Sequence, residues 1–118
     1  MVVDDDVGII YTIKRGLEGT DGYKVTTVTS GVECIELLKD NKIPDLILLD
    51  SILHEMSGWD TYNQLKDNDK WKNIPVVFLT ARTNRIAKDA GGFHGDDYIE
   101  KPFKVPELKE RIEKILKK

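Results

Sequence analysis

Five polar side chains stand at the ends of short apolar runs in this sequence. The runs and their side chains are 2–3 with Asp4 and Asp5, 46–49 with Asp50, 75–79 with Thr80, and 98–99 with Lys101. If the runs are neighbouring parallel strands, their carboxyl ends meet at one edge of a sheet, where α/β proteins place functional sites. The sequence therefore predicts that three carboxylates, a hydroxyl and an ammonium lie close together.

This set of side chains suits the transfer of a phosphoryl group. Three converging carboxylates repel one another, so a cation must lie among them or one carboxylate must take up a proton. Lys101 offsets one charge, and Mg²⁺ is the expected further cation because it binds few carboxylates and keeps several waters. A carboxylate can form an acyl phosphate, and cations and a hydroxyl can neutralise the transferring oxygens. We therefore predict phosphoryl transfer to Asp50, with Thr80 and Lys101 contacting the group.

Each of these residues also has an ordinary structural explanation. The acidic run 4–6 could cap a helix and supply its acidic first turn, which the helix dipole favours. Asp50 could cap the turn after its strand, Thr80 could be a strand-end hydroxyl, and Lys101 could be solvated. The joint spacing favours the functional interpretation, because the predicted sheet order brings all these strand ends together.

Short apolar runs alternate with helical patterns along the chain. Strands are expected at 1–3, 23–28, 45–49, 75–79 and 98–99. Apolar residues recur at helical spacing from Val7 to Leu17, from Val32 to Leu38 with Ser30 as N-cap, from Trp59 to Leu65, around Ile86 and Ala87, and from Leu108 to Ile115. The central runs are apolar on both faces, as in a parallel sheet covered by helices on both sides. We predict a doubly wound α/β fold, a five-stranded parallel sheet in the flavodoxin-like order 2-1-3-4-5.

Size and composition indicate an ordinary globular domain. The chain has 118 residues with a net charge of −3, and we expect one domain over 1–118 without an output domain. The longest apolar run, 46–49, is far too short to cross a membrane. Basic residues are scattered apart from a lysine-rich last helix, so direct nucleic-acid binding is not expected. The single cysteine, Cys34, and the lack of a secretion signal in the opening MVVDDD suit the cytoplasm.

The chain resembles the receiver domain of two-component response regulators over essentially its whole length. The motifs are VVDDD, PDLILLD with Gly58 eight residues after Asp50, PVVFLTAR and DDYIEKPF. The resemblance implies that Asp50 accepts phosphate from a phosphohistidine on a sensor histidine kinase or a histidine phosphotransfer protein. It further implies that Asp5, Asp50 and the Ile52 carbonyl bind Mg²⁺ directly, that Asp4 acts chiefly through water, and that Asp6 begins the first helix.

The resemblance also implies how phosphorylation changes the surface. Thr80 and Lys101 contact the phosphoryl group, and Tyr98 is the aromatic switch residue, with a cis peptide possible between Lys101 and Pro102. The switch acts on a downstream effector protein or a separate output domain. The resemblance is also compatible with a homodimer. Such a domain catalyses its own phosphorylation and slow dephosphorylation, and it is not a conventional turnover enzyme.

Three residue sets depart from the family pattern, and two other functions compete with the first. His54 stands where a proline is usual, His94 precedes DDY, and Gly91-Gly92 predicts a short or mobile fourth helix. An aspartate-nucleophile phosphohydrolase would need a second acid two residues after Asp50, where the chain has Ile52. A non-phosphorylated interaction module with this fold would not need Asp5, Asp50, Thr80 and Lys101.

Overall fold

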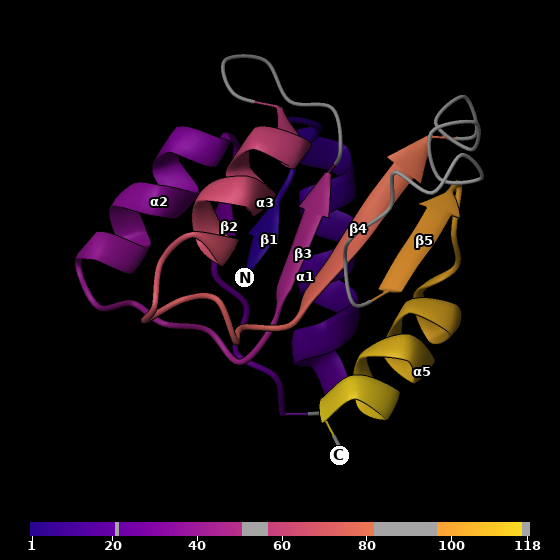
Figure 1. The fold of residues 1–118 in the computed structure, drawn as a ribbon. Coiled ribbons are helices and arrows are strands. Elements are labelled where there is room, and N and C mark those ends of the chain that lie inside the picture. The colour runs from indigo at the N-terminus through magenta and orange to yellow at the C-terminus, as the bar shows by residue number, and fades with distance from the viewer. Residues whose placement is uncertain (21, 51–56, 82–96, 117–118) are drawn as a thin grey trace.

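A computed structural model describes residues 1–20, 22–50, 57–81 and 97–116 of the protein. Its core is a parallel five-stranded sheet in the order β2-β1-β3-β4-β5 (Figure 1). The strands are β1 Val2–Val3, β2 Thr27–Val28, β3 Ile47–Asp50, β4 Val76–Ala81 and β5 Asp97–Lys101. The helices are α1 Val7–Thr20, α2 Gly31–Lys39, α3 Gly58–Lys66 and α5 Val105–Leu116. The predicted fold class and strand order are confirmed.

The strands differ in extent from the sequence prediction. The pattern at 23–28 predicts six strand residues, but only Thr27 and Val28 pair, opposite Val2 and Val3 of β1. A β-branched segment becomes a strand only where a neighbour offers backbone partners, and β1 has two residues. Strand β3 begins two residues later than predicted and extends one residue further, to Asp50, whereas β5 is longer than predicted and ends at Lys101.

Serine side chains cap the first turns of α2 and α3. Ser30, the predicted N-cap of α2, accepts a hydrogen bond from the Glu33 backbone N–H at 3.1 Å, and Glu33 in turn accepts from the backbone and hydroxyl of Thr29. Ser57 accepts from the Asp60 backbone N–H at 3.0 Å and caps α3 in the same way. The helix predicted around Ile86, with the glycine pair that follows it, lies outside the described residues.

The sheet separates two apolar clusters. The first, between the sheet and helices α2 and α3, includes Val3, Leu38, Leu49, Leu65 and Phe78. The second, on the face covered by α1 and α5, includes Val2, Ile13, Leu48, Ile99 and Leu108. Figure 1 shows α2 and α3 in front of the sheet and α1 behind it. Burial on both faces explains why the central strands are apolar at every position until they reach the carboxyl edge.

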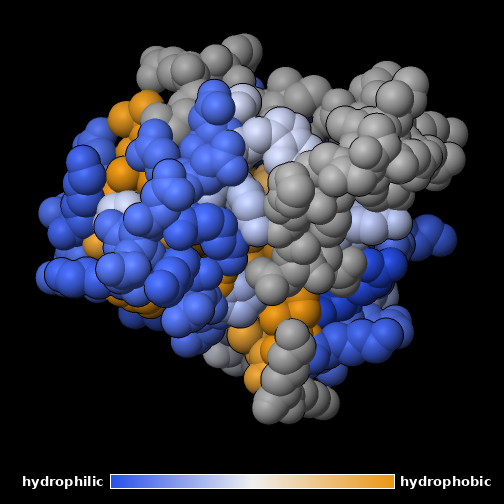
Figure 2. All heavy atoms as spheres, viewed as in Figure 1, coloured by the Kyte–Doolittle hydropathy of each residue, from blue (hydrophilic) through white to orange (hydrophobic). Residues whose placement is uncertain are grey.

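The visible surface over α2 and α3 is mostly hydrophilic, and hydrophobic atoms gather at the lower edge near the end of α5 (Figure 2). Among the described residues, the large hydrophobic side chains that are exposed are Val7, Tyr11, Ile43 and Leu116. None of the helices in the described part of the chain is both long and apolar enough to cross a membrane. The Lys101–Pro102 peptide bond is cis.

Cys34 is fully buried in the first cluster, which makes its thiol unreactive. Burial raises the pKa of the Cys34 thiol to about 11, and only the thiolate reacts with alkylating agents. We expect native protein at pH 8 to react with iodoacetamide at least about a hundredfold more slowly than unfolded protein, from the thiolate fraction alone. Mass spectrometry with and without urea measures this ratio. Equal rates in both conditions would contradict the burial of this side chain.

Candidate functional site

The strand register places Asp4, Asp50 and Lys101 on one face of the sheet. Val2, Leu48 and Ile99 belong to three different strands, and all three lie in the second apolar cluster. Side chains two positions apart in a strand point to the same face. Two residues beyond these three along the chain are Asp4, Asp50 and Lys101. The polar site therefore begins where the apolar face under α1 and α5 ends.

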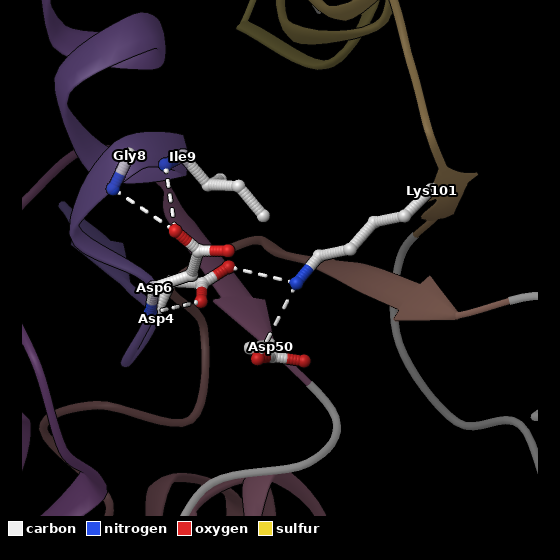
Figure 3. A network of polar contacts seen from close by, with 6 residues as sticks. All are labelled: Asp4, Asp6, Gly8, Ile9, Asp50 and Lys101. Carbon is white, nitrogen blue, oxygen red and sulfur yellow. Dashed lines mark hydrogen bonds and ion pairs between the residues drawn. The ribbon is translucent and has the colours of Figure 1, made fainter.

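Lys101 connects the ends of three strands. Its Nζ lies 2.9 Å from Oδ2 of Asp4 and 3.4 Å from Oδ2 of Asp50 (Figure 3). Asp4 is fully buried, Asp50 is 6% exposed, and the Lys101 side chain is 20% exposed. Such shielding from water makes these ion pairs stronger than surface pairs, and it makes the loss of either partner costly.

The residues of the acidic run 4–6 have different roles. Asp4 accepts the backbone N–H of Asp6 on Oδ1 at 2.9 Å, while its Oδ2 accepts from Lys101. Asp6 caps α1, because its Oδ1 accepts the backbone N–H groups of Gly8 at 2.9 Å and Ile9 at 3.3 Å. The run therefore does two things: Asp6 caps the helix, as the resemblance implied, and Asp4 lies in the polar site, while the first turn of α1 contains no acidic residue.

Asp4, Asp5 and Asp50 form a group that fits a divalent cation. Each offers a carboxylate oxygen, and these oxygens lie within 4.8 Å of one another. Three carboxylates and one ammonium leave a formal charge of −3 + 1 = −2. Hard oxygen ligands and this charge match the preference of Mg²⁺, and Asp5 is less buried than the other two. The residues present therefore fit the predicted metal.

Lys101 keeps its charge in this setting. Burial alone would lower the pKa of Lys101, but the hydrogen bond that its ammonium donates to Asp4 and the charge of Asp50 outweigh burial and raise that pKa above its usual value. A raised lysine pKa means that the ammonium persists through neutral pH and is lost only as pH rises through that raised value. The site therefore holds a permanent cation beside Asp50.

The other predicted site residues fall in different places. Thr80 lies in β4, and its backbone position pairs with Glu100 of β5. Tyr98 is half-buried and packs against the first cluster, on the opposite face from the acids. Its carbonyl accepts a hydrogen bond from Arg111 of α5 at 3.1 Å. Ile52, His54 and His94 lie outside the described residues.

Sequence reasoning missed the aromatic support beneath the site. Trp59, in the first turn of α3, packs on Phe78 of β4 with ring centroids 4.4 Å apart, and Tyr62 lies 5.3 Å from the same ring. Phe78 is fully buried and pairs with Leu49, the residue before Asp50. The helical spacing of Trp59 and Tyr62 marks a buried face, but it does not say which strand they meet.

Comparison with protein families and curated proteins gives a consistent result. A profile of the response regulator receiver domain matches residues 1–113. The transcriptional regulatory protein YvrH of Bacillus subtilis is 39% identical over 120 residues, covering 100% of this chain and 48% of its own length. The phosphate regulon transcriptional regulatory protein PhoB of Rhizobium meliloti is 32% identical, covering 99% of this chain and 51% of its own length. The chain thus spans about half the length of these relatives.

Solved structures show the same fold. The receiver domain of NtrX from Brucella abortus has a TM-score of 0.85 and 28% identity, and the match covers 98% of this chain and 96% of that one. The receiver domain of the sensor histidine kinase PA1611 from Pseudomonas aeruginosa has a TM-score of 0.84 and 24% identity, with 96% and 92% covered. That second structure has a magnesium ion coordinated in its active-site cleft.

Proposed function

This chain belongs to the response regulator receiver domain family, the phosphoacceptor signalling domains of two-component systems, and we propose that Asp50 is its phosphoacceptor. The observation that carries the proposal is the position of this carboxylate. Asp50 ends a buried strand, lies beside a charged lysine, and shares an oxygen cluster with two further acids. A rigid strand end of this kind holds a nucleophile in fixed geometry, which is a main source of rate in phosphoryl transfer.

In the proposed reaction, an oxygen of Asp50 forms a bond to the phosphorus of a phosphohistidine. The phosphorus–nitrogen bond breaks, and its electron pair leaves on the imidazole nitrogen. Asp5 and Asp50 would hold Mg²⁺ together with the Ile52 carbonyl, and the bound ion supplies charge neutralisation for the transferring oxygens. Lys101 supplies a second, permanent positive charge, and Asp4 holds that ammonium in place.

The phosphorylated state is proposed to act through Thr80 and Tyr98. A phosphoryl group adds about −1.5 to −2 charge and strong acceptor oxygens, which would attract the Thr80 hydroxyl and let Tyr98 turn inward. The register supports this link, since Tyr98 pairs with Phe78 and Thr80 follows two residues later in the same strand as Phe78. Arg111 of α5 donates a hydrogen bond to the backbone carbonyl of Tyr98, so a movement of Tyr98 would also change the position of α5.

We propose that residues 1–118 form one receiver domain working in the cytoplasm. Its phosphodonor would be a sensor histidine kinase or a histidine phosphotransfer protein. Its output would be an effector protein or a separate domain, since the curated relatives above are transcriptional regulators about twice as long. Direct nucleic-acid binding by this domain is not expected from its net charge of −3.

Incubation with phosphoramidate, a small donor with a phosphorus–nitrogen bond, tests the function. We expect a mass gain of about 80 Da, one phosphoryl group, in the presence of Mg²⁺ and none in EDTA. An acyl phosphate is also expected to be released by hydroxylamine, whereas a phosphoserine is not. A folded protein that forms no Mg²⁺-dependent adduct with this donor or with acetyl phosphate would refute the proposal.

A further inference from the structure

Helices α1 and α5 come close together at a glycine. A Cβ atom on Gly16 would lie 2.6 Å from Cγ1 and 3.3 Å from Cγ2 of Val105. The first distance is far inside van der Waals contact, and a β-branched side chain has little freedom to turn away in a helix. Glycine destabilises a helix interior relative to alanine, so its use in the middle of α1 corresponds to this close approach.

The contact lies on a short path to the proposed site. Val105 is the first residue of α5 and stands four residues after Lys101. From there α5 buries Leu108 and Ile112 in the second cluster, so its first turn continues into a segment that is packed against the core. At the other end of the path, α1 begins three residues after Asp4, the closest partner of Lys101.

These two contacts join the same pair of chain segments. The ion pair of Lys101 with Asp4 joins β5 to β1, and the contact of Val105 with Gly16 joins the helices that directly follow those strands. The second contact therefore limits where the connection from 102 to 104 can place the end of β5. An outward shift of α5 would pull on this connection and change the distances from the Lys101 ammonium to the carboxylates of Asp4 and Asp50.

We propose that Gly16 is a positioning residue for Lys101. The absence of a side chain at residue 16 lets α5 begin against α1, and this packing sets the distance from the Lys101 ammonium to Asp4 and Asp50. The consequence for phosphoryl transfer rests on the proposed function, whereas the geometric statement stands independently. Gly16 acts through Lys101 and contacts no reacting atom.

Three variants isolate the packing contact. Gly16→Ala introduces the conflicting Cβ, and Gly19→Ala is the matched control in the same helix, because a Cβ there meets no atom within 4 Å. The double variant Gly16→Ala with Val105→Ala removes both Cγ atoms and leaves the Val105 Cβ at 3.5 Å, an ordinary contact. Each variant is measured at a temperature where circular dichroism shows it folded.

The first measurement is the NMR signal of the Lys101 side chain, assigned by its loss in Lys101→Met. We expect this signal to move in Gly16→Ala, to stay in place in Gly19→Ala, and to return in the double variant. The second is the phosphorylation rate with phosphoramidate at saturating Mg²⁺. We expect it to fall on the order of tenfold in Gly16→Ala, as for a small misplacement near a reacting centre, without weaker Mg²⁺ binding.

The two measurements separate the two claims. A Lys101 signal unchanged in folded Gly16→Ala would overturn the positioning role, whatever the rates. A moved signal that the double variant does not restore would also overturn it, because the Val105 contact would not be the cause. A moved and restored signal in a protein that forms no phosphoryl adduct would support the positioning role and refute the proposed function.

Discussion

Asp50→Asn is expected to lose the Mg²⁺-dependent phosphoryl adduct entirely. The substitution keeps the shape of the side chain but replaces the nucleophilic oxygen pair with an amide, which does not form an acyl phosphate. It also removes one of the three clustered carboxylates, so the stabilisation of the fold by Mg²⁺ should shrink. Intact-protein mass spectrometry measures the first effect, and thermal unfolding with and without Mg²⁺ measures the second.

The same strand offers a matched control. Asp45 is an exposed aspartate just before β3, at the opposite end of the strand from Asp50. Asp45→Asn makes the same chemical change and should leave both the adduct and the Mg²⁺ response intact. An adduct that forms at an equal rate in Asp50→Asn would contradict the assignment and direct attention to Asp5, the more accessible of the other two acids.

Lys101→Met is expected to have the second largest effect. The variant keeps an unbranched side chain of similar length but removes the positive charge 3.4 Å from Asp50. Loss of one preorganised charge-stabilising group costs on the order of a hundredfold in rate, so we expect phosphorylation by phosphoramidate to slow by about that factor. Binding of Mg²⁺ should not weaken, because the ammonium competes with the metal for the carboxylates.

Stability supplies a second measurement on the same variant. Asp4 is fully buried and would lose its hydrogen bond from Lys101. A buried group left without its partner costs about 1–3 kcal/mol, so the free energy of unfolding should fall by roughly that amount without Mg²⁺. Lys104→Met, an exposed lysine three residues away, is the control and should change neither quantity. A normal rate in Lys101→Met would contradict the role given to this ammonium.

The sequence was sufficient to predict the sheet order and the meeting of the four charged residues. The reason is that both depend on features visible along the chain: which runs are apolar on both faces, and which residue ends each run. The ends of β3 and β5 carry Asp50 and Lys101, and parallel pairing alone brings such ends to one edge.

Contacts between elements could not be predicted in the same way. Nothing local indicates that Asp4 pairs with Lys101 more closely than Asp50 does, or that Trp59 packs on Phe78. These contacts depend on how far each element lies from its neighbour, which the packing of the whole domain decides. The predicted length of β2 was wrong for a related reason, because pairing depends on the two residues that β1 supplies.

The ion pair between Asp4 and Lys101 joins residues 97 positions apart. During synthesis a chain emerges with its amino end first, and the acidic residues that follow β1 are exposed long before β5 exists. Until Lys101 and the packing residues of α5 have emerged, Asp4 lacks its cation and Asp50 lacks its neighbouring charge. A partly synthesised chain would therefore be a poor acceptor, and only a domain translated through its last helix would be able to receive a signal.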